Sequence, residues 1–399
     1  MIKKAIAPVI AVVAALLFAC GATLRFFPHM SEISDFEVVQ VIGIDKKGDG
    51  VEVTLMADRE SPPGGGGETP GGTGMTGIMS FEGRTVFEAI SRMNIYSDKR
   101  RHLGYVDYLL IDENAARDDI TKYIDFFTRE YEVRYSMVVF ITRGVTAKEL
   151  LRTTATANRR MADVLTNIDE SIKELSNSRM LRLIDLLRML SDGNEAAVIP
   201  AVTYEDTDFA KVIGAEKPEK TAVPDGFAFI RDGRLAGFYD DGLAQAYNGL
   251  TGRAHAVPIS VMAEDGEYAA LELLQYRIDF DAFWDGKTLT GARYDVTVEA
   301  NLTEQFGRGN VFTERGLKTL EDGAAALIER DMRAVAAKSA RLGRDGFELG
   351  QRVRMKNPVK WAGIADEWSE LFPKVDVEID VKCVISRSYD LRERAGEHG

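Results

Sequence analysis

Two cysteines, Cys20 and Cys383, are the most reactive side chains in this 399-residue sequence. A thiol acts as a nucleophile or metal ligand only as the thiolate, which needs a favourable electrostatic setting. Cys383 belongs to an alternating segment, 375–385, in which it shares one face with four valine and isoleucine residues. We therefore interpret Cys383 as a buried structural thiol, and two cysteines predict no disulfide framework.

The histidines are the next candidates for chemistry, as metal ligands or general bases. They are scattered, at His29, His102, His255 and His398, and none has zinc-ligand spacing to another histidine or a cysteine. A carboxylate pair for glycoside hydrolysis stays open, because acidic residues are numerous and none stands out. The sequence thus predicts no catalytic residue, no metal and no cofactor.

Cys20 ends an apolar N-terminal segment. Two lysines precede an uncharged run from Ala5 to Ala19. This pattern is typical of a secretory signal peptide, and residues 17–20, Leu-Phe-Ala-Cys, resemble a bacterial lipobox, in which cleavage leaves the cysteine at the new N-terminus. We therefore predict a lipoprotein signal peptide at 1–20, with Cys20 as the lipidation site.

An uncleaved anchor is the alternative for this segment. The apolar run continues to Leu24 before Arg25, which makes about 20 residues, just enough to span a bilayer. The charges that flank the run favour the N-terminus inside and the body outside. Both interpretations predict an exported body tethered to a membrane.

The net charge of -13 limits the possible partners of that body. An acidic protein is repelled by phosphate backbones and by anionic lipid headgroups. We therefore predict no nucleic-acid binding. Any membrane contact must come from apolar insertion or from a covalent lipid.

Hydrophobic periodicity in the first half alternates between strands and helices. Strands are expected at 36–44, 51–56, 102–111 and 135–142, and helices at 85–96, 114–130, 147–165 and 178–190. The glycine-rich stretch Ser61–Gly77 lacks a phosphate-binding motif and is interpreted as a surface loop, with partner or ligand contact as the sharper hypothesis. Lys99–Arg101 is explained by helix capping, with a lipid or partner contact as the alternative.

The second half shows a similar pattern after a polar stretch, 210–225, that is interpreted as a linker. Strands are expected at 226–230, 235–239, 254–262, 271–279, 294–302 and 375–385, and a long helix at 313–342. The apolar stripe of this helix, from Leu317 to Leu342, is predicted to pack on the sheet that contains the last strand. Asn301 begins a glycosylation sequon of a kind that often arises by chance.

The expected fold is therefore α/β (α+β), multidomain, with mixed β-sheets flanked by helices. The predicted organisation is a signal peptide at 1–20, an N-terminal α/β domain at 21–209, a linker at 210–225 and a C-terminal α/β domain at 226–399.

Several segments, in order, resemble the Ger(x)C family of spore germination proteins, the C subunits of nutrient germinant receptors. They are Cys20, 41–45 (Val-Ile-Gly-Ile-Asp), 83–89 (Gly-Arg-Thr-Val-Phe-Glu-Ala), 102–143, 225–229 (Asp-Gly-Phe-Ala-Phe) and 345–385. The resemblance implies a lipoprotein without known enzymatic activity on the outer face of the spore inner membrane. It also implies membrane-embedded A and B subunits as partners in nutrient-triggered germination.

Two other functions compete with a receptor subunit. Two α/β lobes joined by a linker could close on a small ligand, as in an exported solute-binding lipoprotein. An exported hydrolase would need acidic residues, or a serine and a histidine, to converge in one cleft.

Overall fold

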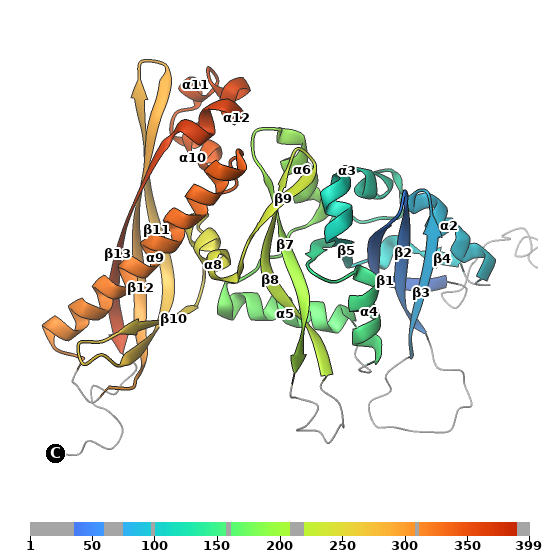
Figure 1. Ribbon diagram of the computed structural model, residues 1–399, viewed down its shortest axis with the longest axis horizontal. Helices are drawn as coiled ribbons and strands as arrows, with labels where there is room; N and C mark the ends of the chain where they lie inside the picture. Colours follow the sequence, from blue (N-terminus) through green and yellow to red (C-terminus); the bar gives the residue numbers. More distant parts are fainter. Residues whose placement is uncertain are drawn as a thin grey trace, which may run out of the picture.

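The computed structural model describes residues 36–59, 75–96, 100–156, 161–207, 219–307 and 311–388. Two mixed β-sheets lie one beyond the other in an elongated molecule, with helices on their faces (Figure 1). This arrangement confirms the predicted fold class. The predicted signal segment, with Cys20, lies outside the described residues.

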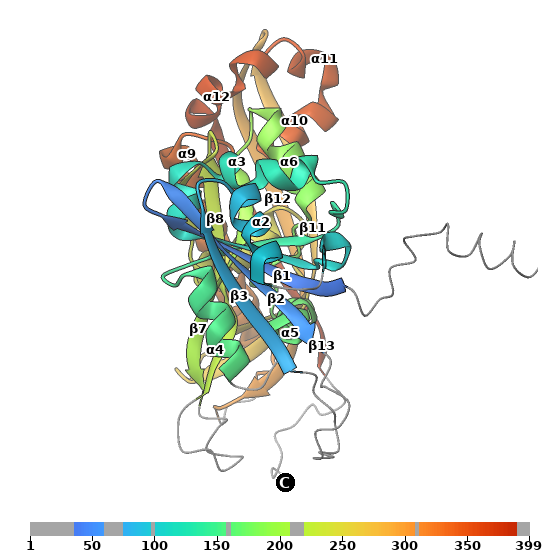
Figure 2. The same cartoon turned by 90° about the vertical axis from the view of Figure 1, so that its right-hand side faces the viewer.

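The first sheet has the strand order β3-β2-β1-β5-β6-β7-β8-β9, and β4 pairs with the start of β1. Its strands are β1 (Phe36–Lys47), β2 (Gly50–Arg59), β3 (Met75–Gly83), β4 (Arg100–His102), β5 (Tyr108–Asp112), β6 (Val138–Thr142), β7 (Ala197–Thr207), β8 (Glu219–Arg231) and β9 (Arg234–Tyr239). Strands β1, β5, β6 and β7 are parallel, whereas the β1-β2-β3 and β7-β8-β9 pairings are antiparallel. Figure 2 faces the β3 edge.

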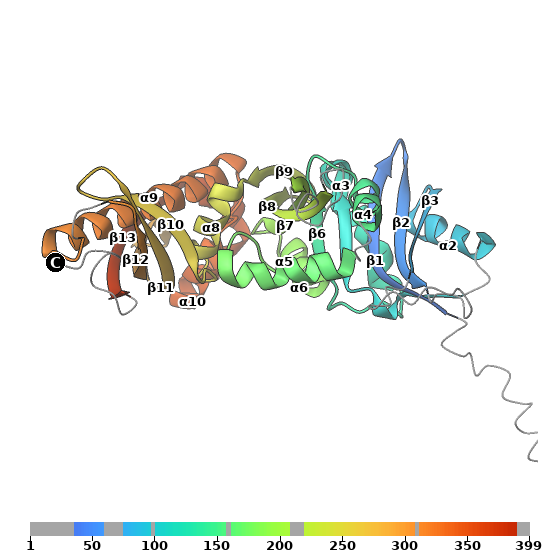
Figure 3. The ribbon, with the colours of Figure 1, turned by 90° about the horizontal axis from the view of Figure 1, so that it is seen from below.

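Helices cover both faces of this sheet, so its central strands are buried on both sides. One face carries α2 (Val86–Tyr96), α3 (Glu113–Arg129) and α6 (Leu183–Asp192). The other carries α4 (Ala147–Thr156) and α5 (Met161–Leu175), which lies along the sheet in Figure 3.

Helix α3 illustrates how a capping residue and apolar spacing in the sequence determine where a helix begins and which face it buries. The carboxylate of Asp112 accepts a hydrogen bond from the backbone N–H of Ala115 at 2.6 Å and caps the first turn. Ile120, Ile124 and Phe127 recur at helical spacing and are buried against the sheet.

The second sheet has the order β10-β11-β12-β13, with only the last pair parallel. Its strands are β10 (Val257–Met262), β11 (Tyr268–Asp285), β12 (Thr288–Gln305) and β13 (Asp376–Ser388); the helices of this half are α8 (Asp241–Leu250), α9 (Glu314–Leu342), α10 (Leu349–Lys356), α11 (Pro358–Trp361) and α12 (Trp368–Leu371).

The predicted packing of α9 on this sheet is confirmed. Leu320, Ile328 and Met332 are buried in one core with Ile379 and Cys383 of β13. The guanidinium of Arg333 also donates to the carbonyl oxygen of Ile379 at 2.6 Å, so polar and apolar contacts hold the two elements together. Leu327, which the stripe included, is only half-buried.

The β8–β9 hairpin belongs to two cores at once. Because side chains alternate across a strand, Phe227 and Phe229 of β8 face the C-terminal half, while Ala228 and Ile230 face the core of the first sheet. Tyr239 of β9 joins the C-terminal core, where its hydroxyl hydrogen-bonds the hydroxyl of Ser339 on α9 at 2.5 Å. The two halves are therefore packed together through one shared hairpin.

The described part of the predicted linker, 219–225, is not a linker. It forms the first half of β8 and pairs with β7, a strand that the sequence analysis did not identify. Pro200 made β7 hard to recognise from the sequence, because a proline has no backbone N–H to donate to a neighbouring strand. The structure accommodates it at a register shift between Pro200 and Val202. The first sheet thus extends beyond the predicted domain boundary, and the two-domain division stays a prediction.

Some element boundaries were also wrong. The predicted strand 102–111 is interrupted by a 3₁₀ turn, η2 (Leu103–Tyr105). The predicted helix 147–165 is two helices, since α4 ends in a threonine-rich run of low helix propensity. Residues 75–77, expected in the glycine-rich loop, belong to β3, and residues 61–74 lie outside the described residues. Asn301 is 4% exposed on β12, so it is not a glycosylation site in the folded protein.

Candidate functional site: a charged cavity at the junction of the two halves

A cavity of about 350 Å³ lies where α6 and the residues that flank it meet the C-terminal half. Three arginines and four carboxylates line it, together with two methionines, a leucine and a glutamine. One wall comes from residues 179–195, and the other comes from Arg253, Glu348 and Gln351. Segments far apart in the sequence therefore meet at one polar site, which we call the junction cavity.

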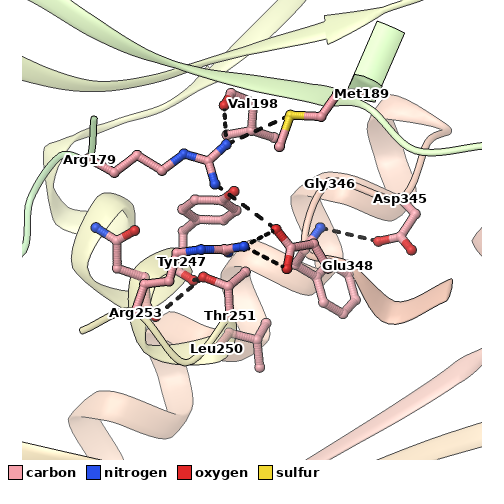
Figure 4. Close-up of polar contacts among 12 residues, drawn as sticks. Arg179, Met189, Val198, Tyr247, Leu250, Thr251, Arg253, Asp345, Gly346 and Glu348 are labelled. Atoms are coloured by element: carbon pink, nitrogen blue, oxygen red, sulfur yellow. Dashed lines mark hydrogen bonds and ion pairs between the residues drawn. The ribbon is translucent and has the colours of Figure 1, made fainter. Parts of the chain in front are cut away.

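Glu348 is the centre of the ion pairs in this cavity (Figure 4). Its carboxylate lies 2.7 Å from the Arg253 guanidinium and 4.0 Å from that of Arg179, which belongs to the other half. Arg179 also donates to the carbonyl oxygen of Val198 at 2.6 Å. Its guanidinium carbon lies 5.5 Å from the ring centroid of Tyr247. The ion pair between Arg179 and Glu348 is thus a charged contact across the junction.

Asp345 positions Glu348 by ordering the turn that leads into α10. Its buried carboxylate accepts hydrogen bonds from the backbone N–H groups of Phe347, Leu349 and Gly350, at 3.1, 3.2 and 2.7 Å. Glu348 itself has φ +64°, a left-handed conformation that is unusual for a residue other than glycine. The strained backbone is held because the carboxylate of Asp345 fixes the amides on both sides.

Glu195 forms the opposite wall and, among the described residues, makes no ion pair with a cation. Burial raises its pKa to about 8, and the nearby carboxylates of Asp345, Glu348 and Asp192 add to this effect. Burial also raises the pKa of Asp345 to about 6, against the lowering effect of its backbone hydrogen bonds. Glu195 therefore holds its proton to a higher pH than an exposed glutamate does.

Backbone hydrogen bonds complete the junction. The N–H of Ala196 donates to the carbonyl oxygen of Asp345 at 2.7 Å, and the amide of Asn248 on α8 donates to the carbonyl oxygens of Ser176 and Ser178 at 2.8 and 3.0 Å. The N–H of His255 donates to the hydroxyl of Ser176 at 2.6 Å. The cavity is consequently framed by fixed contacts.

This arrangement can bind a small polar molecule. The lining contains no serine, cysteine or histidine. Within the ranges that the structure describes, no group of three His, Cys, Asp or Glu side chains is arranged to hold a metal ion.

The candidates from the sequence lie elsewhere. Cys383 is buried on β13 as predicted, and burial raises the pKa of its thiol to about 12, with Glu321 adding to the shift. The imidazole Nδ1 of His102 lies 3.3 Å from the carboxylate of Glu132 in the first sheet's half, whereas His255 contributes its backbone to the junction. His29 and His398 lie outside the described residues.

The sequence analysis missed the residues of the junction cavity. One signal was available: Asp345 stands shortly before a helix, where an aspartate commonly caps the first amides. Glu195 and Glu348 carry no such signal, because 152 intervening residues separate them and their meeting depends on the packing of the two halves.

Among the described residues, no helix combines the length and the apolar character that a membrane span requires.

Comparison with known proteins covers both halves. Residues 29–204 match the family model of the spore germination protein N-terminal domain, and residues 225–389 match that of the spore germination B3/GerAC-like C-terminal domain. Both models together span most of the chain. They meet near the segment predicted as a linker.

Individual relatives agree. The chain is 24% identical to spore germination protein B3 of Bacillus subtilis over 319 residues, which cover 77% of this chain and 79% of that protein. It is 19% identical to spore germination protein KC of the same organism over 388 residues, 90% of each chain. The crystal structure of the GerBC protein matches with a TM-score of 0.54 at 20% identity and covers 87% of this chain and 97% of that one, which shows a common fold. The chain belongs to the Ger(x)C family of spore germination proteins.

Proposed function

We propose that this protein is a non-enzymatic lipoprotein subunit of a spore germinant receptor that acts with membrane-embedded A and B subunits in nutrient-triggered germination. The observation that carries the proposal is the match of two germination-protein family models to nearly the whole chain. A junction cavity whose lining has no serine, cysteine or histidine is consistent with a binding or structural role.

Affinity capture from spore membranes tests the complex. The tagged full chain, solubilised in mild detergent, is expected to bring down multi-pass membrane proteins that mass spectrometry identifies. An unrelated spore lipoprotein with the same tag is the control. Recovery of the chain without any multi-pass partner would contradict the proposal.

The tether is tested separately, through the lipidation site. Two acyl chains on Cys20 would anchor the protein stably, whereas its acidic body adds no attraction to anionic lipids. Cys20→Ala is therefore expected to release the protein from membranes or to leave an unprocessed precursor, which fractionation and intact mass would reveal. Cys383→Ala, at the buried thiol, is the matched control. Unchanged mass and membrane retention of Cys20→Ala would favour the uncleaved anchor.

A solute-binding lipoprotein remains the second candidate, because the junction cavity lies between the two halves and has polar walls. The shared β8–β9 hairpin favours a fixed cavity over closure of two lobes, since one core continues across the junction. A single small solute that raises the melting temperature in proportion to the logarithm of its concentration would support this candidate. Glu195→Gln should weaken that response.

A further inference from the structure

Exposed tyrosines gather at the end of the first sheet where the N-terminal segment joins the fold. Tyr105, Tyr131 and Tyr135 are 51%, 90% and 40% exposed. Tyr105 lies in η2, and the other two lie in the loop between α3 and β6. We call these three residues the tyrosine patch.

The tyrosine patch is tied directly to the start of β1. Val38 of β1 pairs with His102 of β4, and the ring of His102 lies 5.3 Å from that of Tyr105. The carboxylate of Glu132, next to Tyr131, accepts a hydrogen bond from the N–H of Leu103 at 3.1 Å. These contacts fix the loop and η2 beside the first described residues of the chain.

The position of the patch relates it to the proposed tether. Phe36 is sixteen positions after Cys20, so a lipid on Cys20 holds β1 within roughly 55 Å of the bilayer even if the chain is fully extended. An uncleaved anchor, ending near Arg25, shortens this distance further. The second sheet lies at the opposite end of the elongated molecule from β1 (Figure 3). Either anchor therefore keeps the tyrosine patch within reach of the membrane.

Tyrosine is suited to a bilayer surface, because its ring enters the apolar boundary while its hydroxyl stays hydrated. Electrostatic adsorption is unavailable to a chain with a net charge of -13. Arg134, whose guanidinium carbon lies 5.4 Å from the centroid of the Tyr105 ring, supplies a local positive charge for a phosphate headgroup.

We propose that the tyrosine patch inserts into the headgroup region of the bilayer and orients the tethered protein on the membrane. The inference rests on the proposed membrane tether, which alone would leave the body free to rotate. With the patch inserted, the first sheet lies near the membrane and the second sheet projects away from it.

Fluorescence quenching by lipid tests this orientation. The full chain, isolated with its native anchor, is reconstituted on vesicles of phosphatidylcholine and phosphatidylglycerol, with or without bromine on the acyl chains. Tyr131→Trp places a reporter in the patch. Tyr268→Trp is the matched control, because Tyr268 is 52% exposed at the start of β11. All three native tryptophans, Trp284, Trp361 and Trp368, belong to the C-terminal half and give both variants the same background.

The expected result is a loss of emission and a blue shift for Tyr131→Trp on brominated vesicles, with neither for Tyr268→Trp. Tyr105→Trp should repeat the result at the η2 position. Vesicle sedimentation, measured in parallel, reports the tether alone. A chain that sediments without quenching at position 131 would overturn the patch and leave the tether intact, as would equal quenching at positions 131 and 268. A chain that does not sediment would overturn both.

Discussion

The charged cavity at the junction of the two halves and the contact between α9 and the second sheet are held by different forces. Beneath α9, Leu320, Ile328 and Met332 pack against β13 in a continuous apolar core. At the junction, Glu348 lies between two arginines, and the Nε of Arg179 is buried without a hydrogen-bond partner among the described residues. Burial of apolar surface stabilises the folded state whatever the exact orientation of the side chains. Buried charges stabilise it only when the geometry of their ion pairs and hydrogen bonds is good enough to offset the cost of removing them from water.

This difference indicates a division of roles. The apolar contacts, which include the hairpin core that continues across the junction, supply stability, while the charges of the junction cavity add directional contacts between the two halves. Because the cavity contains ionisable groups, the stability of this part of the junction depends on pH, whereas that of an apolar core does not.

The largest expected effect is in the apolar contact. Met332 is fully buried on α9, and Met332→Asp places an unpaired carboxylate there. We expect the free energy of unfolding to fall by about 4 kcal/mol, measured by denaturant titration. Ala326→Asp, at an exposed position of the same helix, is the control and should change stability by less than about 0.5 kcal/mol. Equal effects at the two positions would contradict the packing.

Removal of the central carboxylate should have an intermediate effect. Glu348→Ala leaves Arg179 buried without its counter-ion, and we expect a loss of about 2 kcal/mol, reduced because Arg253 is partly exposed. Glu378→Ala breaks the pair with Arg293, in which both side chains are 43% exposed, and should change the stability far less. If the junction variant cost no more than this control, the junction charges would have no structural role.

The third prediction concerns pH. Glu195 binds its proton more tightly in the folded protein than in the unfolded chain, with a pKa raised to about 8. Its contribution to the stability of the folded state is therefore greatest in acid and is lost as the pH rises from about 4.5 to 8. Glu195→Gln should flatten this dependence and make the variant more stable than the parent at pH 9. Glu267→Gln, at an exposed turn, should leave the profile unchanged.

The smallest effect is expected at Cys383, at the edge of the apolar contact. Burial and a raised pKa should keep its thiol unreactive toward iodoacetamide at pH 8 until the protein is unfolded. Cys383→Ala should cost about 1 kcal/mol, because a small buried group is lost. Rapid alkylation of the native protein would show that β13 opens readily from α9.

Elements with strong local periodicity were predictable from the sequence. The stripe of α9 and the alternation around Cys383 each repeat over many residues, so single exceptions such as Leu327 did not obscure them. Strand β7 was missed because Pro200 is locally unfavourable, and only its partner strand explains how it is tolerated. The sequence also did not predict that the two faces of β8 pack in different cores, because an apolar run does not show which core each face of a strand will join.

The junction cavity was beyond sequence reasoning for a different reason. Glu195, Arg253 and Glu348 each look like ordinary surface charges in their own segments. The ion pairs of Glu348 and the raised pKa of Glu195 arise only when the two halves dock.

The shared β8–β9 hairpin has a consequence for the order in which the chain folds. The first sheet can form as soon as residue 239 has emerged, but the aromatic face of Phe227, Phe229 and Tyr239 is then covered only in part, once Tyr247 of α8 follows. The rest of its cover includes Ser339 and Phe347, 100 or more residues after Tyr239 in the chain. A nascent chain that stalls in this interval therefore exposes part of an apolar aromatic surface, which favours aggregation until the second half has folded.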